Sequence, residues 1–457
     1  MTSMKTVLLG SAAAIVATGA AQAADLPVKK AAAVQYVEVC PAFGAGFYRL
    51  PGSDICIKHF GYVKMDASVQ DQRINISEAG ALAVSEDASN TAGWQYSIRP
   101  GWDFRSPTAF GTLRAVVQLR SDRENGTFAG PGPSLTGSDS FSVQAGYIEW
   151  AGFLIGRATS QYQYWGQDDV IGAIGGDTKV TTQQITYVWA APGGLRATIG
   201  LEDTSAWSNA VSDIGAPGAV VGTGPQRMYD VVASLSTEQA WGNAKVSGII
   251  HQISTNNGAT ANSEFEVGWG VLGGITFNLP TLGAGDRLLL QAQYSDGVLI
   301  AGGVQGGASN SLTQFGESGQ YLAGLQRSDF DAYAVASGTT WSLETTKVWS
   351  AAGQFRHYWN PLLRSNLMGS YSKVDVPAVA TTGTLAGGFR GDASAWDVGA
   401  NLIWGKSRQT VELGLEVAYK SVDQNLPAGT TAASITALGG DVNPSGWFAG
   451  AFIQRSW

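Results

Sequence analysis

The sequence offers few histidines for a catalytic base and no clear phosphate-binding loop. The chain has three histidines, His59, His251 and His357, and a hydrolase of the Ser–His type would need one of them beside a serine. The alternation of neighbouring residues places each histidine on the apolar face of its segment, where an interface or packing role is expected. The glycine-rich run over residues 270–274 lacks a following helix and a Lys-Ser/Thr pair, so it does not match a phosphate-binding loop. Because the acidic residues also lack the spacing of a calcium loop, we expect no enzyme activity, no cofactor and no metal site.

The N-terminus has the three parts of a secretory signal. Lys5 precedes an apolar stretch over residues 7–17, and Ala21-Gln22-Ala23 supplies small side chains for cleavage before Ala24. The stretch is too short to span a membrane, and no later segment approaches the roughly 18 apolar residues that a membrane helix requires. We predict a signal peptide over residues 1–23. The formal net charge of −8 for the whole sequence does not suit a nucleic-acid partner.

Two cysteines, Cys40 and Cys56, stand near the start of the exported chain. An oxidising compartment favours a disulfide between them, which would close a short loop that contains Gly44 and Pro51. Metal binding is the other interpretation, but only His59 stands close enough in the sequence to add a ligand. We therefore predict a structural disulfide in an N-terminal segment over residues 24–56.

Apolar and polar side chains alternate along much of the chain. Over residues 410–420, for example, Val411 and Leu413 alternate with Glu412 and Glu416. Successive strand residues point to opposite faces, so each such segment has one apolar and one polar face. A soluble β-protein would bury the apolar face in a core. A membrane barrel would turn that face toward lipid and keep the polar face around water.

Short connections between the expected strands alternate with long ones. The short turns lie near residues 106–108, 151–152, 192–194, 241–243, 281–285, 360–361 and 405–407. A first long connection precedes the first of these turns. The others lie near residues 122–139, 159–182, 204–227, 255–264, 297–343, 377–391 and 422–445. About sixteen strands fit this pattern, an even number with both ends on the short-turn side. We predict an all-β fold over residues 57–457, a sixteen-stranded antiparallel transmembrane β-barrel with short periplasmic turns, wide enough for an aqueous channel.

Aromatic residues gather near the ends of the expected strands. Trp94, Trp150 and Trp404 are examples, and the last strand ends on Trp457 with no tail beyond it. Rings with an apolar body and a polar handle prefer the two interfaces of a membrane, where they form girdles around a barrel. The other interpretation is that these rings fill the core of a soluble β-protein. The terminal aromatic strand favours the membrane barrel.

Short motifs along the chain form a recognisable set. They are Tyr36-Val37-Glu38-Val39-Cys40, Gly44-Ala45-Gly46-Phe47-Tyr48, Pro51-Gly52, Asp54, Cys56-Ile57-Lys58, Gly61-Tyr62-Val63-Lys64, Leu343-Glu344-Thr345-Thr346-Lys347 and Tyr358-Trp359-Asn360-Pro361. With the aromatic end, this set resembles the alphaproteobacterial porins of the rhizobial type, although that family often ends in Phe instead of Trp457. The resemblance implies a homotrimeric general-diffusion porin in the cell outer membrane. Its partners would be small hydrophilic solutes and ions, with outer-membrane lipid and lipopolysaccharide around it.

The resemblance also implies a constriction inside the barrel. In such porins the third outside loop folds inward, and here that loop covers residues 161–182 with the acids Asp168, Asp169 and Asp177. Basic side chains on the inner face of early strands should oppose these acids. The phase of the strands selects Lys64, Arg99 and Arg114. Arg157 is a fourth candidate, on a strand too short to fix the phase. Opposed charges create a transverse field in which dipolar solutes can align.

Two other non-enzymatic functions compete with a general porin. A substrate-selective channel would carry a binding track for sugars or phosphates, and its lumen bases would form a ladder instead of a cluster. A soluble secreted β-sandwich or lectin would bury its alternating apolar residues, and it would need no detergent for extraction.

Overall fold

The computed structural model describes the barrel strands and parts of the loops that join them. The described residues are 37–70, 75–76, 83–84, 91–128, 136–137, 140–167, 169–172, 174–213, 220–256, 265–304, 312, 329–337, 340–377, 391–406, 411–425, 443 and 445–457. The predicted signal peptide over residues 1–23 lies outside these ranges, as do residues 24–36 of the N-terminal segment and Asp168.

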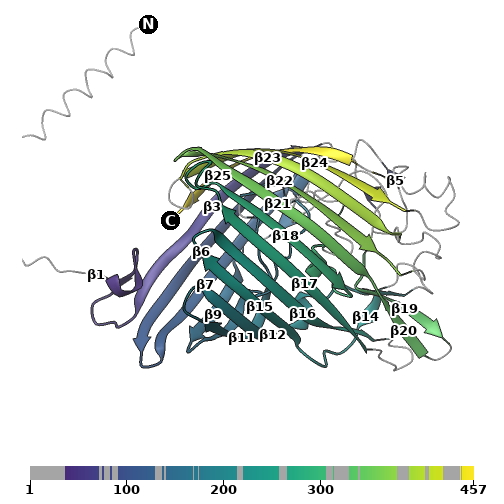
Figure 1. Ribbon diagram of the computed structural model, residues 1–457, viewed down its shortest axis with the longest axis horizontal. Coiled ribbons are helices and arrows are strands. Elements are labelled where there is room, and N and C mark those ends of the chain that lie inside the picture. Colours follow the sequence, from purple (N-terminus) through teal and green to yellow (C-terminus); the bar gives the residue numbers. More distant parts are fainter. Residues whose placement is uncertain are drawn as a thin grey trace, which may run out of the picture.

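Sixteen long strands form a closed antiparallel barrel (Figure 1). They are β3 (Cys56–Gln70), β6 (Ala92–Thr108), β7 (Gly111–Asn125), β9 (Ser142–Trp150), β10 (Phe153–Thr159), β11 (Thr181–Ala190), β12 (Leu195–Glu202), β15 (Asp230–Gln239), β16 (Gly242–Asn256), β17 (Phe265–Asn278), β18 (Arg287–Asp296), β21 (Lys347–Asn360), β22 (Leu363–Asp375), β23 (Ala393–Trp404), β24 (Val411–Gln424) and β25 (Ser445–Ser456). Each strand pairs with the next in chain order, and β25 pairs with β3 to close the sheet. The predicted fold is confirmed.

Shorter elements occupy the N-terminal segment and the outside loops. They are β1 (Glu38–Val39), η1 (Pro41–Phe43), β2 (Tyr48–Arg49), β4 (Asn75–Ile76), β5 (Ala83–Val84), η3 (Gly126–Phe128), β8 (Thr136–Gly137), η4 (Thr204–Ala206), β13 (Val211–Asp213), β14 (Val220–Thr223), η5 (Ile300–Gly302), β19 (Ala332–Ser337) and β20 (Thr340–Thr345). We call residues 160–180 the third loop, 203–229 the fourth loop and 297–346 the sixth loop. In the parts of them that the structure describes, β13 of the fourth loop pairs in parallel with β19 of the sixth.

The outer face of the barrel is apolar and has aromatic residues near both ends of the strands. Toward the long loops, Trp349 packs on Tyr371 with ring centroids 5.0 Å apart, and Tyr419 packs on Trp447 at 4.8 Å. Toward the short turns, Phe153 packs on a neighbouring tyrosine at 5.0 Å. Such girdles mark the two interfaces of a membrane-spanning barrel. No helix in the described part of the chain is long and apolar enough to cross a membrane.

The N-terminal segment is tied to the base of the first barrel strand. Cys40 and Cys56 form a disulfide with an S–S distance of 2.13 Å, as predicted. Both cysteines are buried beside Phe47, and partly buried Phe43 packs on this cluster. β1 pairs with β2, so the segment forms a small folded unit against β3.

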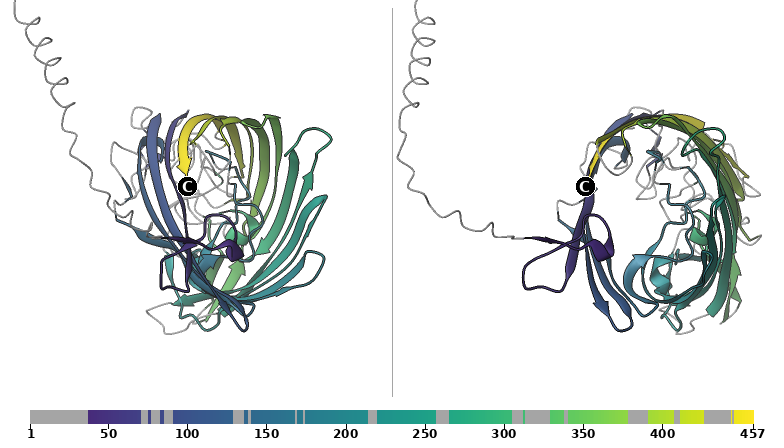
Figure 2. Two further views of the ribbon diagram at one scale, coloured as in Figure 1. Left: turned by 90° about the vertical axis from the view of Figure 1, so that its left-hand side faces the viewer. Right: turned by 60° about the vertical axis from the view of Figure 1, so that its left-hand side comes forward.

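The interior of the barrel is not uniformly polar. Val232 on β15, Ile249 on β16 and Leu272 on β17 point inward and are buried under side chains of the third, fourth and sixth loops. Figure 2 (right) shows the sheet curving around an interior that contains loop segments. A simple alternation of lipid-facing apolar and water-facing polar residues therefore fails on these strands, because loops inside the barrel provide a second apolar surface to pack against.

Candidate functional site

The third loop folds into the barrel and follows the inner wall formed by β16 to β24. Two buried carboxylates fix its middle part. Glu416 on β24 accepts hydrogen bonds from the backbone N–H groups of Ile171 and Gly172, at 3.0 and 2.6 Å. Asp397 on β23 accepts one from the backbone N–H of Gly175 at 2.9 Å. Because these bonds join acids of the wall to the backbone of the loop, they hold its path largely independently of its side chains.

Asp169, an acid predicted to face the pore, is directed toward the wall. Its carboxylate forms ion pairs with Arg356 on β21 and with Arg364 on β22, the second at 3.2 Å. The same Arg364 guanidinium bonds Glu412 on β24 at 2.6 Å. Asn401 donates a further hydrogen bond to the backbone carbonyl of Asp169 at 2.6 Å. The negative charge at this position is therefore balanced on its own side of the barrel.

The other loop acids lie in different settings. Asp177 is partly buried, and its carboxylate accepts the backbone N–H of Lys179 at 2.9 Å. Asp168 lies outside the described residues. The structure therefore shows one of the three predicted acids, Asp169, held in a network of arginines.

Further contacts hold the two ends of the third loop. The backbone N–H of Trp165 donates to Gln291 on β18 at 3.0 Å, and Gln291 and Gln293 donate to the carbonyl of Gly176 at 2.9 and 2.8 Å. The Tyr164 ring lies over Gly274 on β17, where a Cβ atom would overlap the ring. The glycine run 270–274 thus makes room for the loop at Gly274.

The opposite wall, formed by β3, β6, β7 and β9, carries paired charges. Lys64 forms an ion pair with Asp66 at 2.7 Å. Arg99 bonds Asp122 through its second terminal nitrogen at 3.1 Å. Lys64 and Arg99 lie in the middle of the adjacent strands β3 and β6. Arg99 pairs with the residue two positions before Lys64, so both bases are on the same face and close together. The structure therefore brings these two predicted bases together, each beside an acid.

Arg114, the third predicted base, lies close to the short turn between β6 and β7. Its guanidinium bonds Asp103 at 3.0 Å and Glu149 at 2.9 Å. Arg364, the partner of Asp169, is likewise near the short-turn end, at the second position of β22. Arg114 and Asp169 therefore both lie toward this end, on opposite walls.

Sequence reasoning missed several members of the charged wall. Arg105 bonds Asp103 at 2.8 Å, and Arg120 forms an ion pair with Asp122. These residues have the same strand phase as Arg99 and Arg114, so the alternation could have found them. The acids were not proposed for the constriction because the search was for bases that would oppose the third loop.

Arg157 does not belong to the lumen-facing bases. On β10 the side chains of Phe153 and Ile155 are exposed on the outer face, whereas Leu154 and Ala158 are buried on the inner face. Arg157 has the phase of the exposed pair. The prediction of a lumen position failed because the strand is short and offers few residues to fix its phase.

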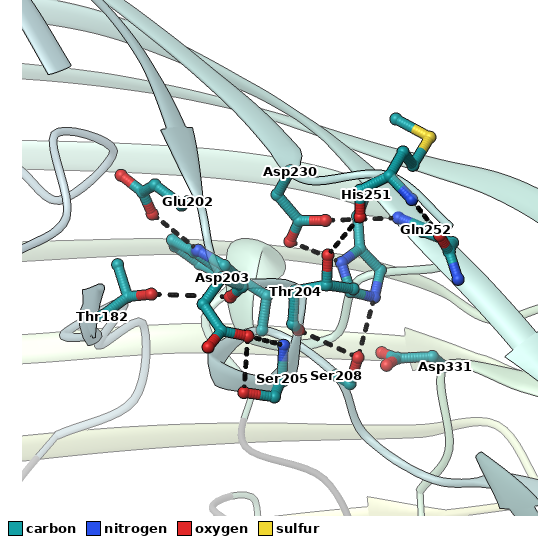
Figure 3. A network of polar contacts seen from close by, with 12 residues as sticks. Thr182, Glu202, Asp203, Thr204, Ser205, Ser208, Asp230, His251, Gln252 and Asp331 are labelled. Atoms are coloured by element: carbon teal, nitrogen blue, oxygen red, sulfur yellow. Dashed lines mark hydrogen bonds and ion pairs between the residues drawn. The ribbon is translucent and has the colours of Figure 1, made fainter. Parts of the chain in front are cut away.

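His251, predicted to lie on the apolar face with an interface or packing role, is buried inside the barrel. Its neighbour Ile250 is exposed on the outside, whereas His251 points inward and is 1% exposed. Its Nδ1 atom lies 2.7 Å from a carboxylate oxygen of Asp230, and its Nε2 atom lies 3.4 Å from the hydroxyl of Ser208 (Figure 3). The apolar residues on its face, Ile249 and Ile253, pack on the loops inside the barrel and not on lipid.

Comparison with known proteins agrees with this architecture. The family model described as the porin subfamily matches residues 25–441. Porin Omp2b of Brucella suis is 32% identical over 269 residues, which cover 54% of this chain and 65% of that protein. Porin Omp2a of Brucella ovis is 34% identical over 223 residues, which cover 44% of this chain and 59% of that protein. The matched part of the chain thus spans 65% and 59% of the lengths of these relatives.

A solved structure shares the fold at low sequence identity. The outer membrane channel DcaP of Acinetobacter baumannii has a TM-score of 0.59 and 14% identity, with 89% of this chain and 98% of that chain covered. At this identity the likeness concerns the fold alone. The closed barrel, its two aromatic girdles and the family match over most of the sequence give one assignment: the chain is an outer-membrane protein that belongs to the porin subfamily.

Proposed function

We propose that the chain forms a water-filled channel through which small hydrophilic solutes and ions diffuse passively across the outer membrane. The observation that carries this proposal is the third loop, which is fixed inside a closed barrel across from a wall of charged side chains. A barrel of sixteen strands is wide enough for water, and an inward loop would limit the size of the solutes that pass.

The proposed constriction combines the third loop with the charged wall. Its acids are Asp168, Asp169 and Asp177, and its bases are Lys64, Arg99 and Arg114. Because Asp169 is bound by two arginines, the field across the opening would be weaker than a simple row of free acids would produce. Solutes that carry both signs of charge would still find paired partners along the wall.

Liposome swelling tests the diffusion proposal. Vesicles with the purified protein should swell in neutral sugars at rates that fall smoothly with sugar size, whereas protein-free vesicles should not swell. Rates that do not differ from those of protein-free vesicles would contradict a diffusion channel.

A substrate-selective channel is a second candidate, favoured by the arrangement of the wall. The bases Arg99, Arg105, Arg114 and Arg120 are spread along β6 and β7 with Asp103 and Asp122 between them, which is closer to a ladder than to a cluster. A selective channel would show saturable uptake of one solute and competition by its analogues. Uptake that rises linearly with concentration would exclude this candidate.

We also propose that the protein is exported by a signal peptide cleaved after Ala23 and assembles as a homotrimer in contact with lipopolysaccharide. The wall where β3 meets β25 is the proposed trimer contact. Val63 and Met65 are exposed there on the outer face, and Met65 is in register with Ile453. Cross-linking of unboiled membranes should give a trimer, and a monomer alone would contradict the proposed assembly.

A further inference from the structure

A single buried carboxylate joins the fourth and sixth loops inside the barrel. Asp331, just before β19, is 1% exposed. One of its oxygens accepts the backbone N–H of Leu299 at 2.8 Å, and the other accepts the backbone N–H of Asn209 at 2.5 Å. Because Leu299 directly precedes η5 in the sixth loop and Asn209 follows η4 in the fourth loop, this carboxylate connects three separate segments.

His251 on β16 of the barrel wall lies close to the same point. Its ring bonds Asp230 of β15, and its other nitrogen faces Ser208 of the fourth loop, as Figure 3 shows. The charge of His251 also acts on Asp331. Two successive residues of the fourth loop therefore have partners outside it. Ser208 faces the imidazole of His251 on the wall, and Asn209 donates to the carboxylate of Asp331 in the sixth loop.

An apolar cluster begins at the residue after Asp331. Val211, Ile253, Ala332 and Ala334 form one buried cluster where the fourth loop, β16 and the sixth loop meet. Three other titratable groups of these segments are buried: Asp230 of β15, His251 of β16 and Asp329 of the sixth loop. In the described part of the fourth loop, Asp203 bonds Ser205 of its own turn instead.

We propose that Asp331 is a protonation-controlled latch, which holds the fourth and sixth loops together more firmly as the pH falls. This inference rests on the proposed channel function only for its effect on transport. Burial raises the pKa of the Asp331 carboxyl from its ordinary 3.8 to about 6, and the charge of His251 and the two backbone N–H groups oppose this rise.

The direction of the pH effect follows from this raised pKa. When the latch is closed, Asp331 holds its proton up to about pH 6, whereas in opened loops it would lose the proton near its ordinary 3.8. The closed state therefore binds more protons between these two values, and its stability rises as the pH falls through that window. Above the window, the closed latch contains an ionised carboxylate that is costly to bury.

Hydrogen exchange of the purified protein tests the latch. The backbone N–H groups of Asn209 and Leu299 should be protected about tenfold more at roughly pH 5 than at roughly pH 7.5, after correction for intrinsic rates. In Asp331→Asn, which cannot ionise, their protection should not depend on pH. The control Asp203→Asn removes an acid from the fourth loop, at the other side of the latch, and should keep the full pH dependence.

Two outcomes would overturn the latch: no change of protection with pH in the wild type, or the same change in Asp331→Asn. If Asp331→Asn fails to fold, His251→Gln takes its place. Removal of the imidazole should move the midpoint of the exchange profile to higher pH, and an unmoved midpoint would contradict the proposal.

The effect of the latch on transport is measured separately. Current fluctuations in bilayers should be smaller at roughly pH 5 than at roughly pH 7.5. If the two N–H groups show the expected protection but the bilayer shows no current, the latch proposal is kept and the channel function is rejected.

Discussion

Glu416 is the residue on which the position of the third loop depends most. It is 2% exposed and accepts hydrogen bonds from Ile171, Gly172 and Asn401. The substitution Glu416→Ala would leave two buried backbone N–H groups unpaired, at about 1–3 kcal/mol each. We expect a looser loop, a larger single-channel conductance and uptake of larger sugars.

The matched control for this substitution is Glu238→Ala, which removes an exposed acid beside a short turn. It should leave conductance and size limit as in the wild type. If Glu416→Ala and Glu238→Ala behave alike, the carboxylate of Glu416 does not position the loop.

The charge of Asp169 gives a second prediction at this scale. Asp169→Asn would leave Arg356 and Arg364 with less opposing charge, so the reversal potential in a salt gradient should move toward anions. Arg99→Ser should move it toward cations, because Asp122 would lose a partner. Both shifts should shrink as the Debye length falls from ~10 Å at 0.1 M to ~3 Å at 1 M salt. Unchanged potentials in dilute salt would remove both residues from the constriction.

The disulfide gives a third prediction. Cys40 and Cys56 are 16 positions apart, and a loop of about this size contributes ~3 kcal/mol in the chain-entropy account. Cys40→Ser together with Cys56→Ser should make the N-terminal segment easier to cleave by protease, whereas the barrel should stay resistant. Equal protease resistance of the segment in both proteins would show that the disulfide does not stabilise it.

At the scale of elements, strand positions followed from the sequence and loop contacts did not. The short turn expected near residues 151–152 separates β9 from β10, and the one expected near residues 192–194 separates β11 from β12. Alternation and turn residues are local signals, so they are enough to locate strands. The bond between Ile171 and Glu416 joins residues 245 positions apart, and no local pattern encodes it.

Gly274 supplies the prediction that belongs to the elements. A side chain at this position of β17 would overlap the Tyr164 ring, so Gly274→Val should push the third loop away from the wall. Conductance should rise, and the fluorescence of the nearby Trp165 should shift toward the spectrum of an exposed ring. Gly273→Val is the matched control, because Gly273 has nothing within 4 Å of an added Cβ. A wild-type spectrum for Gly274→Val would contradict this contact.

At the scale of the whole molecule, the sequence indicated the barrel but not how its interior is divided. Apolar clusters built by the third, fourth and sixth loops cover the inner face of β15 to β17, whereas paired charges line the wall from β3 to β9. We infer that water passes along the charged wall and that the loops close off the apolar sector. The alternation around His251 could not show this division, since it looks identical whether lipid or a loop covers the apolar face.

Single-channel recording of the purified protein in planar bilayers tests this account most directly. A water-filled channel narrowed by a fixed loop should give discrete current steps whose conductance rises with KCl concentration nearly as bulk conductivity does. The steps should be larger in Glu416→Ala and unchanged in Glu238→Ala. A current that saturates at low salt, or a bilayer that shows no steps at all, would contradict the account.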